Sequence, residues 1–282
     1  MNDFHVNLDG LKIRCRDAGG TGPAVLLLHG VGGSLELWSA QFAVAHQDLR
    51  LLAVDLPGHG LSDFSAQADS PPRFAQTLWA LLDALAIHQV HLVGNSLGGA
   101  ICLQMHLSQP ARVRSMLLAA SANLGTAAPL PFRLMTLPGL GELMARPGET
   151  AVTQQVQAIF GPDFVVTPEL RALIRRNVMR AGAQRAFLDC VRQMTGLRGQ
   201  RVALIEQAQA SLAMSRVPTL LLHGRQDAVI PVAHSQDSCA RHAHLQLDVI
   251  DRCGHTPQLE QPEHFNAQMG ALIRQGCLSE GA

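Results

Sequence analysis

Short apolar runs alternate along the chain with longer amphipathic stretches. The apolar runs lie at Val25–Leu28, Leu51–Val54, His91–Val93, Val113–Ala119, Thr219–His223 and Leu245–Ile250. A short apolar run bounded by turn residues is typical of a strand that is buried on both faces. Helical periodicity lies between these runs, near Leu35–Ala45, Arg73–Leu85, Leu97–Leu107, Val232–Ala240 and Glu263–Gln275. The alternation predicts an α/β protein with a mostly parallel sheet and helices on both of its faces.

Two further stretches complete the predicted architecture. Residues 4–16 alternate around Asp9-Gly10, which predicts two antiparallel strands. Roughly 100 residues separate the run at 113–119 from Thr219, far more than one crossover helix needs. Helical patterns in that stretch lie near Ala151–Phe160, Pro168–Arg180, Ala183–Met194 and Val202–Ala213. We therefore expect an eight-stranded core formed by residues 1–122 and 216–282, with a helical cap, residues 123–215, inserted after strand six.

A serine flanked by glycines stands where a buried run gives way to helix-forming residues. The segment reads Gly94-Asn95-Ser96-Leu97-Gly98. A sharp turn there places the serine in strained backbone, and a Cβ at either glycine would collide with a neighbouring strand or helix. Free N–H groups at the helix start and the helix dipole then favour negative charge on an oxygen beside the serine. The pattern G-x-S-x-G in a strand–turn–helix context indicates a nucleophile elbow.

The serine needs a base, and His255 is the best placed of the 13 histidines. It follows the last predicted strand, and Asp227 follows the strand before that one. A carboxylate at that point would orient the imidazole and stabilise its charged form. The order Ser96, Asp227, His255 predicts a catalytic triad. The rival carboxylates are expected on a solvated helix, within a strand and at a strand end: Asp237, Asp248 and Asp251.

A glycine-rich loop, His29–Gly33, follows the first parallel run. Its flexibility allows it to fold back over the elbow, so the backbone N–H groups of Val31 and Leu97 are the predicted oxyanion donors. Losing one such donor typically costs about 3 kcal/mol of transition-state stabilisation. The predicted substrate-binding residues are Gly30, Gly32 and Asn95.

Five motifs, taken in order, resemble the α/β-hydrolase superfamily. They are HG-x-G-G from His29, D-x-P-G-x-G-x-S from Asp55, G-x-S-x-G-G from Gly94, G-R-x-D-x-x-x-P from Gly224 and G-H-x-P-x-x-E from Gly254. The resemblance covers nearly the whole chain and implies the α/β-hydrolase fold with serine hydrolase chemistry. It also implies that the loop after Asp55 mainly shapes the fold, so His59 is not expected to be catalytic.

Within that superfamily the motifs point in two directions. The elbow with Asn95 is similar to that of the meta-cleavage-product hydrolases, which cleave carbon–carbon bonds in vinylogous diketones. Those enzymes usually carry a proline after the loop glycines and a tryptophan after the base, where this chain has Ser34 and Thr256. The segments at 29–38 and 254–260 look more like carboxylesterases and lactone or thioester hydrolases.

The cap contributes two sets of candidate substrate contacts. Arginines clustered on one predicted helix could bind a substrate carboxylate or form a solvated face: Arg175, Arg176 and Arg180. Apolar residues could line an acyl pocket or pack the cap's own core: Phe132, Leu134, Met135, Leu137, Leu140, Met144, Phe160 and Phe164.

Composition excludes several classes of function. The chain has 282 residues, 47% hydrophobic and 16% charged, with 22 basic and 22 acidic side chains. Nothing in this balance favours nucleic acid or an anionic membrane, and near-zero net charge favours self-association, so a homodimer is an expectation. No apolar run approaches a membrane span. The six cysteines show no regular spacing and no signal peptide is evident, so we expect free thiols in the cytoplasm, no metal and no cofactor.

These observations predict a serine hydrolase that cleaves an apolar carboxylic ester, or a related lactone or thioester, through an acyl-enzyme on Ser96. The alternative is a carbon–carbon bond hydrolase that acts on a meta-cleavage product. Transfer to an acceptor other than water would use the same residues. A ligand-binding protein that retains the triad is a hypothesis from another class, and multiple turnover of an ester would exclude it.

Overall fold

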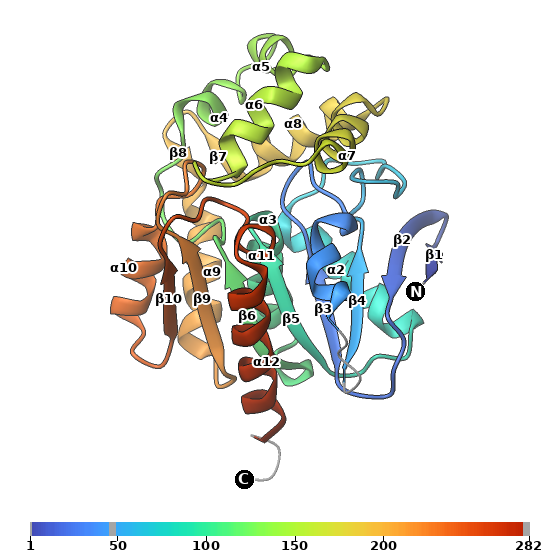
Figure 1. Ribbon diagram of the computed structural model, residues 1–282, viewed down its shortest axis with the longest axis vertical. Helices are drawn as coiled ribbons and strands as arrows, with labels where there is room; N and C mark the ends of the chain where they lie inside the picture. Colours follow the sequence, from blue (N-terminus) through green and yellow to red (C-terminus); the bar gives the residue numbers. More distant parts are fainter. Residues whose placement is uncertain (1, 45–48, 279–282) are drawn as a thin grey trace.

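The centre of the molecule is a single eight-stranded sheet (Figure 1), in a computed structural model that describes residues 2–44 and 49–278. The strand order is β1-β2-β4-β3-β5-β6-β9-β10. The first two strands form an antiparallel hairpin, β2 pairs antiparallel with β4, and all later pairs are parallel. The predicted eight-stranded, mostly parallel sheet is confirmed. Its strands are β1 (Asn2–Leu8), β2 (Leu11–Asp17), β3 (Ala24–Leu28), β4 (Arg50–Val54), β5 (Val90–Asn95), β6 (Val113–Ala119), β9 (Thr219–Gly224) and β10 (Gln246–Ile250).

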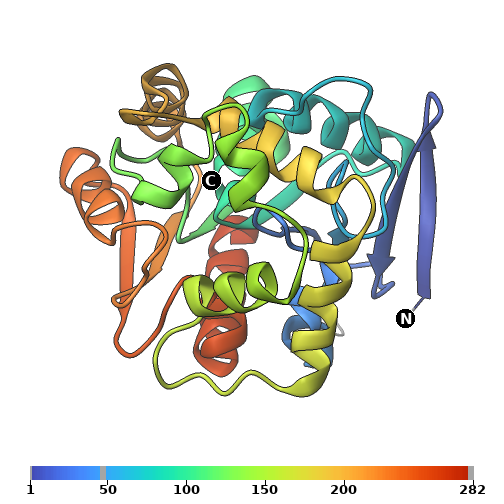
Figure 2. The same cartoon turned by 90° about the horizontal axis from the view of Figure 1, so that it is seen from above.

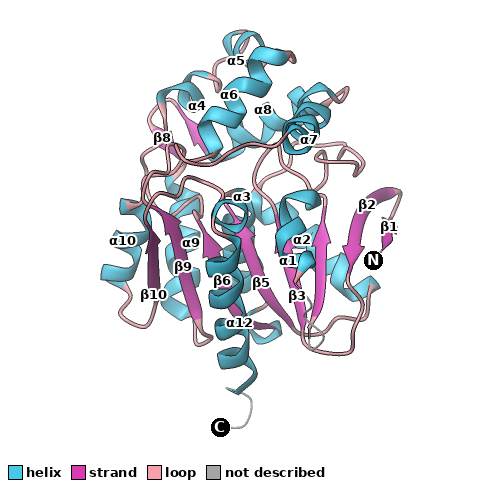
Figure 3. Cartoon of the chain, in the orientation of Figure 1, coloured by secondary structure: helices cyan, strands magenta, loops and turns pink. Residues whose placement is uncertain are grey.

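Helices cover both faces of this sheet (Figure 3) and bury two apolar clusters against it. One face carries α2 (Pro71–Ala84), α3 (Leu97–Ser108), α9 (Val202–Met214) and α10 (Ala233–Arg241). The other carries η1 (Leu35–Trp38), α1 (Ser39–Ala43), α11 (Pro257–Glu260) and α12 (Pro262–Leu278), and a short turn, η2 (Pro110–Arg112), precedes β6. Because the inner strands are buried on both faces, they read as continuous apolar runs rather than as alternating ones.

The helix expected over 35–45 differs from the prediction. It begins as the 3₁₀ turn η1, and Trp38, with φ −102° and ψ 11°, interrupts the helical geometry before α1. Val44 is extended, with φ −85° and ψ 128°, and ends α1. The expected end at residue 45 lies outside the described residues.

The inserted segment lies mostly over the carboxyl ends of the strands (Figures 1 and 2). It contains α4 (Leu130–Leu134), α5 (Leu140–Met144), α6 (Glu149–Ile159), α7 (Pro168–Met179), α8 (Ala183–Met194) and the small hairpin β7 (Thr195–Gly196) and β8 (Gly199–Gln200). The sequence analysis missed α4, α5 and this hairpin, because they are too short to show a period. Helix α9 belongs beside the sheet instead: Ser211 lies 2.9 Å from the His106 ring and Gln207 accepts from Gln104 over 3.0 Å, both on α3.

Candidate active site

Ser96 occupies the turn between β5 and α3. Its φ of 56° and ψ of −114° form a conformation that residues with a Cβ rarely adopt. A Cβ on Gly94 would lie 2.3 Å from the carbonyl carbon of Gly98, and one on Gly98 would lie 2.0 Å from the carbonyl oxygen of Leu28. The predicted strained serine between two required glycines is confirmed.

Asp227 and His255 form a hydrogen-bonded pair in the loops that follow β9 and β10. His255 Nδ1 donates to Asp227 Oδ2 over 2.8 Å, and Oδ1 accepts from the amides of Val229 and Ile230 at 2.7 and 2.9 Å. Burial by itself raises the pKa of Asp227, but the nearby charge of His255 and the imidazole hydrogen bonds hold that pKa below its usual value. The carboxylate is therefore ionised at neutral pH, and because Nδ1 of His255 donates to it, Nε2 is the ring nitrogen left to accept a proton.

Asn95 joins the elbow to the histidine loop. Its amide donates to the carbonyl oxygen of His255 over 2.9 Å, and its Oδ1 accepts from Gln258 at 3.3 Å. The side chain is thus engaged with protein groups, and its role in substrate binding stays a prediction. Over the described ranges no hydrogen bond joins the Ser96 hydroxyl to the His255 ring, so the step between them belongs to the proposal below.

Glu260 closes the histidine loop and ties the inserted segment to it. Its carboxylate accepts from the amides of Gly254 and Thr256 at 2.8 and 3.0 Å, and from the amide of Gly161, just after α6, at 2.8 Å. The sequence analysis quoted this residue as the last position of G-H-x-P-x-x-E but gave it no role. Its only signal in the sequence was its place four residues after Thr256, because its other partner, Gly161, is 99 positions away.

The loop His29–Gly33 is fixed by a buried imidazole that the sequence analysis did not assign. His29 Nδ1 donates to the carbonyl oxygen of Gly30 over 2.7 Å, and Nε2 accepts from the amide of Leu56 over 3.1 Å. Burial lowers the pKa of His29 to about 4, so the ring is neutral at pH 7. This ring therefore connects the loops that follow β3 and β4.

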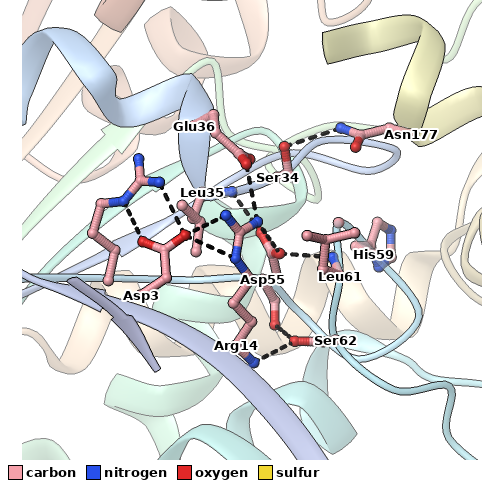
Figure 4. Close-up of polar contacts among 12 residues, drawn as sticks. Asp3, Arg14, Ser34, Leu35, Glu36, Asp55, His59, Leu61, Ser62 and Asn177 are labelled. Carbon is pink, nitrogen blue, oxygen red and sulfur yellow. Dashed lines mark hydrogen bonds and ion pairs between the residues drawn. The ribbon is translucent and has the colours of Figure 1, made fainter. Parts of the chain in front are cut away.

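Asp55 organises the loop after β4 (Figure 4). Its carboxylate accepts from the amides of Leu35 and Leu61, both at 2.7 Å, and from Arg14 at 3.1 Å. A Cβ on Gly60 would lie 2.2 Å from that carboxylate. His59 lies beside this network, and its ring donates to a backbone carbonyl oxygen over 2.9 Å. These contacts agree with the expectation that the loop shapes the fold.

An uncharged cavity of about 50 Å³ opens onto Ser96, Val31 and Leu97. In the part of the chain that the structure describes, the backbone amides of Val31 and Leu97 donate to no other protein group. Gly30 packs its backbone near the serine, since a Cβ there would lie 3.2 Å from Ser96 Cβ, and Gly32 faces Gln155 of α6 and Phe187 of α8 instead. The remaining wall is apolar apart from two polar side chains, and its main members are Phe132, Val191, Met194, Thr195 and Gln200.

Most of the apolar cap residues that the sequence offered for this wall lie elsewhere. Phe132 lines the cavity, and the other seven do not. Phe160 and Phe164, for example, stack on each other with ring centroids 4.5 Å apart. Apolar side chains of similar size look alike in sequence, and only the path of the short helices decides which one faces the serine.

The three arginines of the helix α7 region bind protein groups. Arg176 pairs with Glu36 at 2.8 Å, and Arg180 donates to the carbonyl oxygens of the loop after β4, including that of Gly60 at 2.8 Å. Arg175 pairs with Glu149. The expectation that this cluster could bind a substrate carboxylate is not supported, because each guanidinium already has an acceptor. Asn177, the residue after Arg176, donates to Ser34 over 3.0 Å (Figure 4).

Two of the three rival carboxylates are engaged away from the serine, and the third, Asp237, is exposed on α10. Asp248 contacts His264 at 2.6 Å, and Asp251 pairs with Arg225. Over residues 2–44 and 49–278, no three His, Cys, Asp or Glu side chains are grouped as a metal site would require. Nor does any helix in those ranges combine the length and the apolar character of a membrane span.

Comparison with known proteins gives a consistent result. A family model described as alpha/beta hydrolase fold matches residues 23–262. The chain is 30% identical to the dihydrolipoyllysine-residue acetyltransferase component of the acetoin cleaving system of Pseudomonas putida, with 94% of this chain and 67% of that protein covered. It is 29% identical to the 2-hydroxymuconate semialdehyde hydrolase of Pseudomonas sp. CF600, covering 94% and 91%. The solved structure of a candidate aryl esterase from Burkholderia cenocepacia superposes with a TM-score of 0.79 at 25% identity, covering 98% and 99%.

Proposed function

Because the chain belongs to the α/β-hydrolase family and is a hydrolase, we propose that it cleaves a short, uncharged carboxylic ester through an acyl-enzyme on Ser96. The observation that carries this proposal is the arrangement at the carboxyl edge of the sheet. A strained serine opens onto one uncharged cavity, as do two amides that have no partner among the described residues, and the buried Asp227–His255 pair lies in the adjoining loops.

The proposed reaction has two halves. Ser96 Oγ attacks the ester carbonyl carbon while its proton passes to His255 Nε2, which must come within about 3 Å of the hydroxyl. The amides of Val31 and Leu97 hold the resulting oxyanion, and Asp227 stabilises the imidazolium. The carbon–alkoxy bond then breaks, and the leaving oxygen takes the proton from His255. In the second half water attacks the acyl-enzyme by the same route and releases the acid and the free serine.

The cavity supports a small, neutral acyl group. Its volume is about 50 Å³, and none of its lining residues is charged. One water molecule needs about 10–15 Å³ of such volume, so a group of a few heavy atoms fills the cavity. A long acyl chain would need the segment above the cavity to move. We propose that α4 to α8, within residues 123–215, form a cap that covers Ser96, on a core made of residues 1–122 and 216–282 together with α9.

Asn95 has a supporting role in this proposal. Both protons of its amide are directed at backbone oxygens, those of Ala119 at 3.2 Å and His255 at 2.9 Å. It therefore holds the histidine loop against the elbow, so that loss of Asn95 would misplace the base.

The test combines labelling with turnover. A fluorophosphonate should label the protein once, Ser96→Ala should lose the label, and Ser65→Ala, a serine outside the cavity, should keep it. Hydrolysis of p-nitrophenyl acetate or butyrate should exceed that of the octanoate by at least about tenfold in kcat/KM. Labelling that persists in Ser96→Ala would contradict the proposal, and a single burst without turnover would indicate a binding protein.

A second candidate is carbon–carbon bond hydrolysis, which the 29% identity to a 2-hydroxymuconate semialdehyde hydrolase favours. Such a substrate carries a carboxylate. The uncharged cavity and the paired arginines of the α7 region supply no obvious cation for it. Bleaching of a yellow dienolate at a higher kcat/KM than that for any short ester would make this the better assignment.

A further inference from the structure

We propose that His223 is a positioning residue that tunes the base His255 through the carboxylate they share. This inference rests on the proposed roles of Asp227 and His255. His223 is on β9, fully buried, and its Nε2 lies 3.1 Å from Asp227 Oδ2. That oxygen also accepts from His255 Nδ1 over 2.8 Å. Two imidazoles, one on β9 and one in the loop after β10, therefore donate to one carboxylate oxygen.

The hydrogen bonds around His223 define its proton positions. Nε2 faces two acceptors, Asp227 Oδ2 and the carbonyl oxygen of Ile230 at 3.0 Å, so it carries a hydrogen. Nδ1 lies 2.8 Å from the hydroxyl of Ser235 on α10. A neutral ring with its hydrogen on Nε2 has a bare Nδ1, which accepts from that hydroxyl. The two acceptors at Nε2 thus fix the tautomer that donates to the carboxylate, and Ser235 supplies the donor that its bare Nδ1 needs.

The carboxylate of Asp227 consequently has a full set of donors. Two backbone amides hold Oδ1, and the two imidazoles hold Oδ2. The donation from His223 stabilises the negative charge of Asp227 and so competes with His255 for it. Removing that donor leaves more of the charge to stabilise the His255 imidazolium, which raises the pKa of His255. It also frees Oδ2 to move, which loosens the orientation of the base.

Other titratable groups face this cluster and must stay constant in a test. From α10, His234 lies near enough for the charges of Asp227 and Asp237 to act on it, while burial lowers its pKa. From the histidine loop, Glu260 is held by three backbone amides. None of these groups donates to Asp227 Oδ2, so a substitution at His223 changes one hydrogen bond to the carboxylate and leaves these charges in place.

The matched variants are His223→Leu, which removes the donor at similar volume, and His223→Gln, whose amide can donate from nearly the same place. A third is Ser235→Ala, which leaves His223 in place but removes the hydroxyl that donates to its Nδ1. NMR titration of the His255 ring gives its pKa without any need for turnover. The pH profile of kcat/KM on p-nitrophenyl butyrate reports the pKa of the same group through its effect on the reaction.

We expect the His255 pKa, and with it the acidic limb of the profile, to rise by about 0.5–1 unit in His223→Leu. We also expect kcat to fall about tenfold with KM within twofold, and His223→Gln to restore most of both. If His223→Leu does not fold, Ser235→Ala should move the limb in the same direction by a smaller amount.

An unmoved His255 titration in every folded variant would overturn the inference, and so would equal impairment of the Gln and Leu variants without a shift. Failure of the proposed function would look different, because the wild-type protein itself would then show neither ester turnover nor labelling of Ser96.

Discussion

Replacing Ser96 with glycine should abolish activity and stabilise the fold. The serine backbone, at φ 56° and ψ −114°, is the mirror image of an ordinary extended conformation. Glycine adopts that region freely, whereas a residue with a Cβ is strained there by about 1–3 kcal/mol. Glycine costs about 0.4–1 kcal/mol through the greater freedom of the unfolded chain. The net expectation is that Ser96→Gly is about 0.5–2 kcal/mol more stable than Ser96→Ala.

The comparison with alanine isolates the backbone. Both variants lack the hydroxyl and should lose at least about 10⁴-fold in kcat, but only alanine keeps the Cβ that causes the strain. A gain of 1 kcal/mol shifts Tm by about 2–4 °C in a chain of this size, so Ser96→Gly should melt about 1–8 °C above Ser96→Ala. Circular dichroism melts and urea titrations measure this directly.

Ser39 provides the matched control. It is exposed and ordinary in conformation, with φ −55° and ψ −37° at the start of α1. Glycine there should be less stable than alanine by about 0.5–1 kcal/mol, the opposite sign. If Ser96→Gly proved no more stable than Ser96→Ala while the Ser39 pair behaved as expected, the elbow would hold no releasable strain and the reasoning would fail.

Three further outcomes are expected. Gly98→Ala would place its Cβ 2.0 Å from the Leu28 carbonyl oxygen and should unfold the protein or lower its free energy of unfolding by more than about 4 kcal/mol. Gly196→Ala, whose Cβ meets nothing within 4 Å, should melt at the wild-type temperature. A stable Gly98→Ala would refute the close packing. Burial lowers the pKa of His91 to about 4, so its contribution to stability is complete above about pH 6.5 and is lost as the pH falls towards 4. In that window His91→Gln should flatten the slope of unfolding free energy against pH by up to about 1.4 kcal/mol per unit, and an unchanged slope would count against a neutral buried ring. Met194→Ala should enlarge the cavity beside the serine and lower the free energy of unfolding by about 2–4 kcal/mol. It should also raise the kcat/KM of hexanoate esters relative to acetate esters by about tenfold. An unaltered chain-length preference would show that this wall does not contact the acyl group.

The sheet and the elbow were predictable because their causes are local. A buried parallel strand must be apolar along its whole length, and the turn at Ser96 requires glycine at Gly94 and Gly98 for lack of space. Both constraints act over a few residues and leave a readable pattern. Since parallel strands end at one edge of the sheet, a serine, an aspartate and a histidine that each follow such a strand were also expected to gather there.

The supporting groups had no such pattern. Glu260 meets Gly161 across 99 positions, and Asn177 meets Ser34 across 143. The α7 arginines resembled a carboxylate site in sequence, but folding gives each guanidinium an acceptor in the protein. The role of a polar side chain depends on its hydrogen-bond partner. A partner far along the chain comes into contact only when the helices and strands pack together.

The amino-acid sequence by itself determined the layered sheet, the strained nucleophile turn and the chain order of the three predicted catalytic side chains. Tertiary structure alone decided that His223 and His255 donate to the same oxygen of Asp227, that His29 connects two loops, and which apolar residues wall the cavity. The physical reason is the separation along the chain over which each effect acts. Backbone sterics and burial periodicity act between residues that are close in sequence. Hydrogen bonds and cavity shape depend on spatial distances between segments that are far apart in sequence.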